Sequence, residues 1–261
     1  MLFFARQYEG FTLKEMSFWE HVEELRKMIM KIVWILVISF LVTTYYVDQI
    51  TEILLKPLRE SLQISGGGTI VYHSIFEKAW VQVDVSIMWA IIFASPLWFY
   101  QIWRFIRPGL FDHEARAVKP FMILGWLLFI GGMTAGYFAL PYVISFLAKL
   151  GVEGVTANIN LRDYVTNVSY VLLFLGAIFQ FPNILLILGF MGIVTKQLLR
   201  KFRRYIYVGM AVFAAIFSPP DVISMLSIWI PLCLLYEIGV LAVAWIVHPY
   251  LYYIHMKKPK E

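Results

Sequence analysis

Residues 164–190 read YVTNVSYVLLFLGAIFQFPNILLILGF, an apolar stretch without a single Asp, Glu, Lys or Arg. A helix needs about 20 such residues to cross a hydrocarbon core of roughly 30 Å. Comparable runs recur along the chain, and 61% of its 261 residues are hydrophobic, against about 45–50% in soluble domains. The sequence therefore predicts an all-α polytopic membrane protein.

The apolar runs predict six transmembrane helices. They lie near residues 28–47, 78–103, 119–147, 164–190, 205–218 and 222–247. The fifth is short because Pro219, Pro220 and Asp221 follow Ser218, and proline pairs stop helices. A span of this length either packs among longer neighbours or thins the bilayer locally.

Lysine and arginine are distributed unevenly between the two sides of the predicted membrane. Sixteen of the 22 fall in the N-terminal segment, in alternate loops and in the C-terminal tail, five fall in the remaining loops, and Lys31 lies in the first span. The positive-inside rule therefore predicts that both termini are cytoplasmic. This topology also accounts for the net charge of +5, so we expect a lipid bilayer and no nucleic acid as partner.

The same pattern predicts three segments. Residues 1–27 form a cytosolic amphipathic helix, residues 28–247 the membrane domain, and residues 248–261 a cytosolic basic tail. Between the first two spans we expect an extracytoplasmic cap of short helices, interrupted by a turn at Pro57. The single cysteine, Cys233, excludes an intrachain disulfide, and we expect no metal site.

Two motifs place carboxylates at the cytosolic surface. Ser17-Phe18-Trp19-Glu20 is a capping box, and the helix that it starts carries Glu20, Glu24, Lys27 and Lys31 on one face. That face is either a set of ordinary ion pairs between residues three or four apart or a binding surface.

The second motif, FYQIWRFIRPGLFDHEAR from Phe99 to Arg116, is an aromatic helix end that leads into a loop of mixed charge. A turn is expected at Pro108. Glu114 in this loop either pairs with Arg107 or Arg116 or is available to a ligand.

Four motifs in order resemble those of the TatC family, the signal-reading subunits of the twin-arginine protein translocase. They are His21-Val22-Glu23-Glu24-Leu25-Arg26-Lys27, the segment from Tyr100 to Arg116, Ser218-Pro219-Pro220-Asp221, and Pro231 through Glu237-Ile238-Gly239-Val240. The resemblance covers the chain from Ser17 to about Val247. It implies that Glu24 and Glu114 bind the paired arginines of signal peptides on folded precursors. The surrounding site residues would be Arg26, Phe105, His113 and Arg116.

The resemblance has further implications. Transport would be driven by the proton-motive force, without a nucleotide, a cofactor or an enzymatic activity. Partners would include single-span TatA-like and TatB-like subunits and further copies of the chain. The lack of a transit peptide leads us to expect a bacterial or archaeal cytoplasmic membrane.

Two polar residues within the spans are predicted to dock partners in the membrane. Gln180 stands where many relatives carry glutamate, although Gln180 or Asn183 could instead satisfy a carbonyl freed by Pro182. Glu237 lies midway along the last span and pairs with either a buried hydroxyl or another chain.

The alternative function is a small-solute secondary transporter, which would require midplane charges and symmetric broken helices. An intramembrane enzyme is disfavoured because neither H-E-x-x-H nor G-x-S-x-G occurs and all five histidines lie outside the spans or at their ends.

Overall fold

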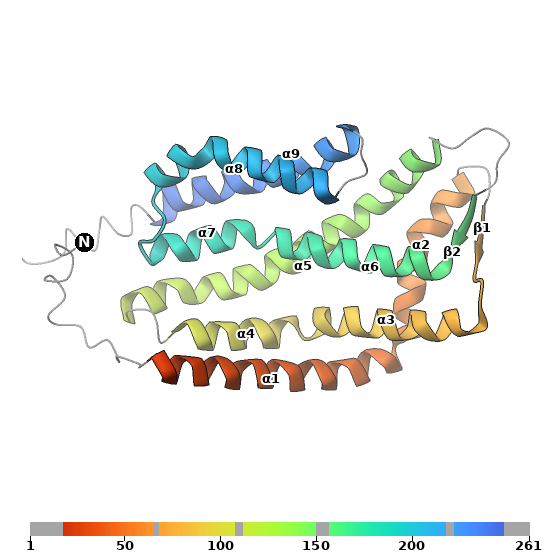
Figure 1. Cartoon of the computed structure of the whole chain (residues 1–261), viewed down its shortest axis with the longest axis horizontal. Coiled ribbons are helices and arrows are strands. Elements are labelled where there is room, and N and C mark those ends of the chain that lie inside the picture. The colour runs from red at the N-terminus through yellow and green to blue at the C-terminus, as the bar shows by residue number, and fades with distance from the viewer. Residues whose placement is uncertain (1–17, 65–67, 108–111, 150–156, 218–221, 248–261) are drawn as a thin grey trace, which may run out of the picture. The chain divides into compact units, whose positions relative to one another are not determined.

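The computed structural model describes residues 18–64, 68–107, 112–149, 157–217 and 222–247, with the side chains of Phe18, Ile64, residues 112–118, residues 147–149, Ala157, Phe217, Ile223, Ser224 and Ser227 left aside. Figure 1 shows the elements. The helices are α1 (Phe18–Tyr45), α2 (Val47–Ile64), α3 (Ile75–Phe93), α4 (Ser95–Ile106), α5 (Asp112–Lys149), α6 (Leu161–Ile178), α7 (Phe181–Phe190), α8 (Lys196–Phe217) and α9 (Val222–Ala242), followed by a π-helical turn (Val243–Val247). The strands are β1 (Gly68–Val71) and β2 (Ala157–Asn160).

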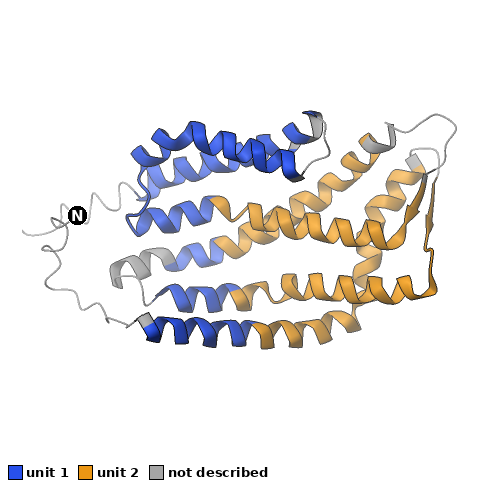
Figure 2. Cartoon of the chain, in the orientation of Figure 1, with its two compact units in different colours: residues 1–32, 99–124, 182–261 blue, residues 33–98, 125–181 orange. Residues whose placement is uncertain are grey.

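The chain divides into two compact units (Figure 2). The first comprises residues 1–32, 99–124 and 182–261, and the second comprises residues 33–98 and 125–181. Several helices therefore contribute one end to each unit, and the functional site described below lies wholly in the first.

Four of the predicted spans are single helical segments long and apolar enough to cross a membrane. They are Trp19–Tyr45, Lys119–Phe146, Leu161–Phe190 and Ile228–Val247. The predicted span at 78–103 consists of α3 and α4, which meet at an angle of 52°. The predicted fifth span lies in α8, whose first half carries five basic residues, so its apolar part alone is short.

The bend between α3 and α4 follows from Pro96, which has no amide hydrogen to donate to the preceding turn. The indole Nε1 of Trp98 donates to the carbonyl of Ile91 at 2.9 Å, next to the Ile92 carbonyl that Pro96 leaves without its helical donor. Ser95 is fully buried at the bend, and its hydroxyl accepts a hydrogen bond from Trp126 Nε1 at 3.1 Å. Side chains thus stabilise a bend that the sequence did not predict.

The predicted turn at Pro57 is wrong. The helix α2 continues through Pro57 to Ile64. Proline leaves the carbonyl of Ile53 without its helical donor, and the hydroxyl of Tyr137 in α5 donates to that oxygen at 2.9 Å. The hydroxyl of Tyr164 in α6 donates to the neighbouring carbonyl of Leu54 at 3.1 Å. Donors from other helices therefore keep this helix intact.

The segment between the first two spans contains more than helix. After α2, β1 pairs in parallel with β2, with Gly68 opposite Ala157 and Val71 opposite Asn160. The expected cap of short helices is thus one long helix and half of a two-stranded sheet. Strands of four residues are too short to show a reliable alternation in the sequence.

The first predicted span exposes nearly all of its apolar surface. Trp34 is 63% exposed and Leu41 65% exposed, and few of the residues of this segment are buried within the protein. Such exposure is costly in water but favourable in hydrocarbon, which fits a helix that faces lipid.

Candidate functional site

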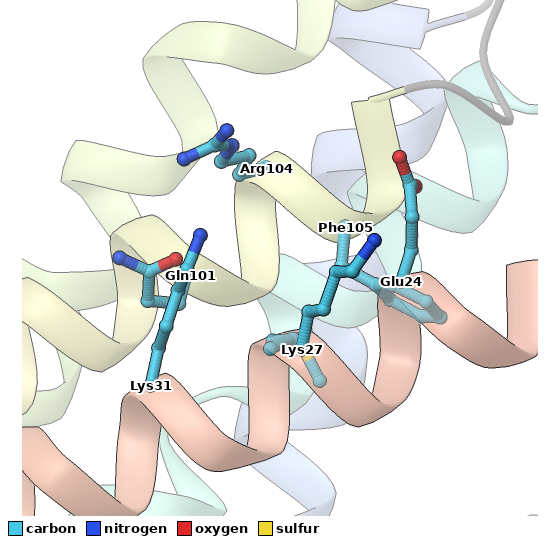
Figure 3. Close-up of a pocket in the computed structure, with 7 residues that line it drawn as sticks. Glu24, Lys27, Lys31, Gln101, Arg104 and Phe105 are labelled. Atoms are coloured by element: carbon cyan, nitrogen blue, oxygen red, sulfur yellow. The ribbon is translucent and has the colours of Figure 1, made fainter.

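A pocket of about 110 Å³ lies between α1 and α4 in the first unit. Figure 3 shows that α1 supplies one wall and α4 the other. The residues that line it are Glu24, Lys27, Met28, Lys31, Gln101, Arg104 and Phe105. Four of them are charged, so the pocket is suited to polar ligands.

Helical spacing explains how these residues come together. Glu24, Lys27, Met28 and Lys31 are separated by three or four residues, which places them on one face of α1. Gln101, Arg104 and Phe105 have the same spacing on α4. The predicted common face of Glu24, Lys27 and Lys31 is therefore confirmed.

Glu23 and Glu24 are adjacent in sequence but have different environments. Glu23 forms an ion pair with Lys27, with 2.7 Å between the carboxylate and Nζ. Glu24 is half-buried at the pocket, and no residue in the described ranges forms a hydrogen bond or an ion pair with its carboxylate. The ordinary ion-pair interpretation thus holds for Glu23 and not for Glu24.

An aromatic pair lies beside Glu24. His21 and Phe105 are stacked, with 4.5 Å between their ring centroids and 24° between their planes. Figure 3 shows Phe105 reaching from α4 towards Glu24. This arrangement offers an incoming side chain a flat apolar surface next to a carboxylate, and guanidinium groups stack on such surfaces.

Of the remaining predicted signal-binding residues, one lies outside the pocket and three have side chains outside the described part of the chain. Arg26 is exposed on α1 and does not line the pocket. His113, Glu114 and Arg116 lie in the first turns of α5, and their side chains are not among those described. Pro108, Pro219, Pro220 and Asp221 lie outside the described residues. That Glu24 and Glu114 bind a signal peptide together therefore stays a prediction.

Three pocket residues, Met28, Gln101 and Arg104, were not among the sites predicted from the sequence. Gln101 and Arg104 line the side of the pocket opposite Lys27 and Lys31. Their separation of three residues indicates a common face of α4. The sequence did not show, however, that this face lies against α1. Among the described residues, no group of three His, Cys, Asp or Glu side chains lies close enough to hold a metal ion.

Gln180 has a partner within the second unit. Its side-chain Nε2 donates to the carbonyl of Gly125 in α5 at 2.8 Å. The bond links the end of α6 to another helix rather than to the turn before Pro182. This hydrogen bond alone explains why a polar side chain lies here. The predicted role of Gln180 in docking a partner subunit stays a prediction.

Glu237 has partners within the first unit. Its Oε2 accepts from Arg203 at 2.6 Å, and its Oε1 accepts from the hydroxyl of Tyr207. Both partners come from α8, so the carboxylate links α8 to α9. Of the two alternatives left open by the sequence, a hydroxyl within the same chain is the one observed.

A comparable ion pair lies in the second unit. Arg162 Nη2 and Asp84 Oδ2 are 3.2 Å apart, and the hydroxyl of Thr166 donates to the same oxygen at 3.4 Å. The guanidinium also lies over the ring of Trp80, at 5.6 Å from the centroid. Asp84 thus joins α3 to α6.

The family model for TatC, the Sec-independent protein translocase protein, matches residues 20–231 of this chain. The chain belongs to the TatC family. It is 33% identical over 221 residues to the Sec-independent protein translocase protein TatC of Escherichia coli (strain K12), covering 84% of this chain and 85% of that protein. It is 32% identical over 230 residues to TatC of Helicobacter pylori (strain J99), covering 88% and 89%.

A solved structure also supports membership in the TatC family. The crystal structure of a twin arginine translocase receptor, TatC, is 32% identical in sequence and superposes with a TM-score of 0.74, covering 86% of this chain and 98% of that one. The six-helix membrane fold predicted from the sequence is therefore confirmed, and the apolar second half of α8 takes the place of the fifth span. As a TatC family member, the chain is a multi-pass membrane component of the twin-arginine translocase rather than a small-solute transporter.

Proposed function

We propose that this TatC protein recognises the paired arginines of twin-arginine signal peptides through Glu24 and Glu114. The proposal rests on the burial and the missing partner of Glu24 among the described residues. Glu24 is half-buried in a pocket between two helices, and within the described ranges its carboxylate has no partner. A half-buried carboxylate with which no described residue pairs is available to a cationic ligand.

The preference for arginine over lysine follows from geometry. A guanidinium is a planar fork that donates two parallel hydrogen bonds to one carboxylate, whereas an ammonium is a point charge. The stacked rings of His21 and Phe105 beside Glu24 provide a flat surface for the same planar group. Glu114 supplies the second carboxylate in this proposal, at the start of α5.

The charges around Glu24 add selectivity. Lys27, Lys31 and Arg104 line the same pocket and repel cations in general. A ligand therefore binds only if its interaction with the carboxylates outweighs this repulsion. Selection against the wrong ligand in this way is common at specific interfaces.

We also propose the membrane, the topology and the partners with which the chain acts. The distribution of lysine and arginine supports cytoplasmic termini and a site at the cytoplasmic face of the cytoplasmic membrane. The chain would act without enzymatic activity, cofactor or nucleotide, in transport driven by the proton-motive force. Its partners would be folded precursors, TatA-like and TatB-like subunits and further copies of itself. Gln180 and Glu237 remain candidates for docking such subunits, in addition to their contacts within the chain.

Photocrosslinking tests the proposal. A twin-arginine signal peptide with a photoreactive residue directly after the arginine pair is bound to the membrane-embedded protein, and the crosslinked residues are mapped. We expect crosslinks to α1 and α4 in the wild type, and their loss with Glu24→Ala, with Glu114→Ala and with a Lys-Lys peptide.

Glu23→Ala is the matched control, because it removes the neighbouring carboxylate, which is already paired with Lys27. It should leave the crosslinks in place. Crosslinks that persist in Glu24→Ala would overturn the proposal.

A further inference from the structure

The pocket between α1 and α4 has a second, basic end. Figure 3 shows Lys31 extending from α1 towards Gln101 on α4, with Arg104 further along α4 and Glu24 at the opposite end beside Phe105. Lys31 lies seven residues after Glu24, which is about 10 Å along a helix. Charges of opposite sign are thus separated along one groove.

Among the described residues, no anion pairs with the cations at this end of the pocket. Lys31 and Arg104 are both exposed, and the residues in the described ranges provide neither of them with an ion pair or a hydrogen bond. Lys27, by contrast, is paired with Glu23. Two like charges lining one pocket repel each other, and a bound anion between them would remove that cost.

The donors suit a phosphate group. A guanidinium and an ammonium are the side chains that bind phosphate oxygens best, and the amide of Gln101 adds an N–H donor on the same wall. Among the described residues that line the pocket, Glu24 is the one carboxylate, and it lies at the far end from these donors. We propose that Lys31, Gln101 and Arg104 bind the phosphate of an anionic membrane phospholipid.

The surroundings of Lys31 indicate a lipid rather than a soluble phosphate. Lys31 belongs to the segment Trp19–Tyr45, which is long and apolar enough to cross a membrane. On the same face of α1, three or four residues from Lys31, lie the apolar side chains of Met28 and Ile35, which are half-buried, and of Trp34, which is 63% exposed. An acyl chain has an apolar surface to follow there, and basic pockets between membrane helices are known to hold lipid head groups.

The lipid site would complement the proposed signal site without depending on it. A phosphate held by Lys31 and Arg104 neutralises the charges that repel an arginine approaching Glu24. The two ends of the pocket then bind ligands of opposite charge, and each can be tested alone.

Native mass spectrometry tests the inference. The full chain is reconstituted in nanodiscs that contain phosphatidylcholine and phosphatidylglycerol in equal parts, and the phosphatidylglycerol that stays bound after release is measured. The double variant Lys31→Gln/Arg104→Gln should retain at least about fivefold less, because each juxtamembrane cation contributes to the attraction of anionic lipid. Lys31→Arg, which keeps the charge, should retain it.

The matched control is Arg200→Gln/Lys201→Gln, which removes the same two charges from exposed positions on α8. It should bind phosphatidylglycerol like the wild type, and Glu24→Gln should do so as well. Thermal unfolding of each variant shows whether it is folded.

Three results would overturn the inference. They are equal loss of phosphatidylglycerol in the two double variants, retention in a folded Lys31→Gln/Arg104→Gln variant, and complete displacement of the lipid by inorganic phosphate alone. The last would identify a free-phosphate site. Loss of the lipid from Lys31→Gln/Arg104→Gln, with signal crosslinks independent of Glu24, would refute the proposed signal site and leave this one standing.

Discussion

Two charged clusters in the first unit differ in how their carboxylates are used. Glu237 on α9 has both oxygens bound within the chain, by Arg203 and Tyr207 of α8. Glu24 on α1 lines an open pocket, and the described residues leave its carboxylate without a partner. Both residues belong to motifs that resemble the TatC family.

The difference separates a carboxylate that is paired within the chain from one that no described residue pairs. A carboxylate in or near a membrane is costly unless it is paired, and Glu237 meets that requirement inside its own unit. No described residue meets it for Glu24, so in the function we propose the signal peptide does. Substitutions at Glu237 should therefore change stability, and substitutions at Glu24 should change binding.

The largest effect on stability is expected for Glu237→Gln. The amide can still bond to Tyr207, but Arg203, which is 42% exposed, loses its counter-charge. Removing a charged hydrogen-bond partner costs about 2 kcal/mol. Thermal unfolding of the detergent-solubilised protein should show a clear fall in midpoint, while the folded fraction binds signal peptide normally.

An unchanged midpoint together with loss of a copurifying TatB-like subunit would contradict this assignment. The main role of Glu237 would then be to dock that subunit.

A smaller effect is expected for Asp84→Asn in the second unit. The substitution removes the charge that faces Arg162, but Thr166 can still donate to the amide oxygen and Trp80 still lies beneath the guanidinium. With these contacts kept, the cost should be about 1 kcal/mol. Chemical unfolding measured on the same preparation as Glu237→Gln would rank the two, and a larger loss for Asp84→Asn would reverse the ranking.

The smallest effect is expected for Glu23→Gln. The Glu23–Lys27 pair is exposed on both sides, at 62% and 64%, and joins residues four apart on one helix. Pairs of this kind contribute little because water and salt screen them. Neither the unfolding midpoint nor signal binding should change measurably, and a drop in binding would mean that both carboxylates of α1 take part.

The sequence predicted those features that depend on local pattern. The helical face of Glu24, Lys27 and Lys31 follows from spacing alone, and the apolar runs placed the spans. The bend at Pro96 and the continuity of α2 through Pro57 were not predictable, because donors from distant residues contribute to both. Trp126 bonds to Ser95 at the bend, and Tyr137 donates to the carbonyl that Pro57 leaves open.

The partners of the carboxylates were only partly predictable. Glu23 and Lys27 are four residues apart, so their pairing follows from the helix. Glu237 and Arg203 are 34 residues apart on different helices, and their meeting requires the packing of α8 on α9. For the same reason the sequence identified Glu24 as a candidate but could not show that Gln101 and Arg104 face it.

The most direct test of the account is a binding cycle with two peptides and three proteins. The affinities of an Arg-Arg signal peptide and its Lys-Lys variant are measured for the wild type, Glu24→Gln and Glu23→Gln in nanodiscs. We expect Glu24→Gln to weaken the binding of the Arg-Arg peptide about tenfold or more, because it removes a charged hydrogen-bond acceptor that a guanidinium grips with two hydrogen bonds. Lys-Lys binding should be weak in all three proteins, and Glu23→Gln should match the wild type. Equal loss of both peptides in Glu24→Gln, or equal effects of the two substitutions, would contradict the account.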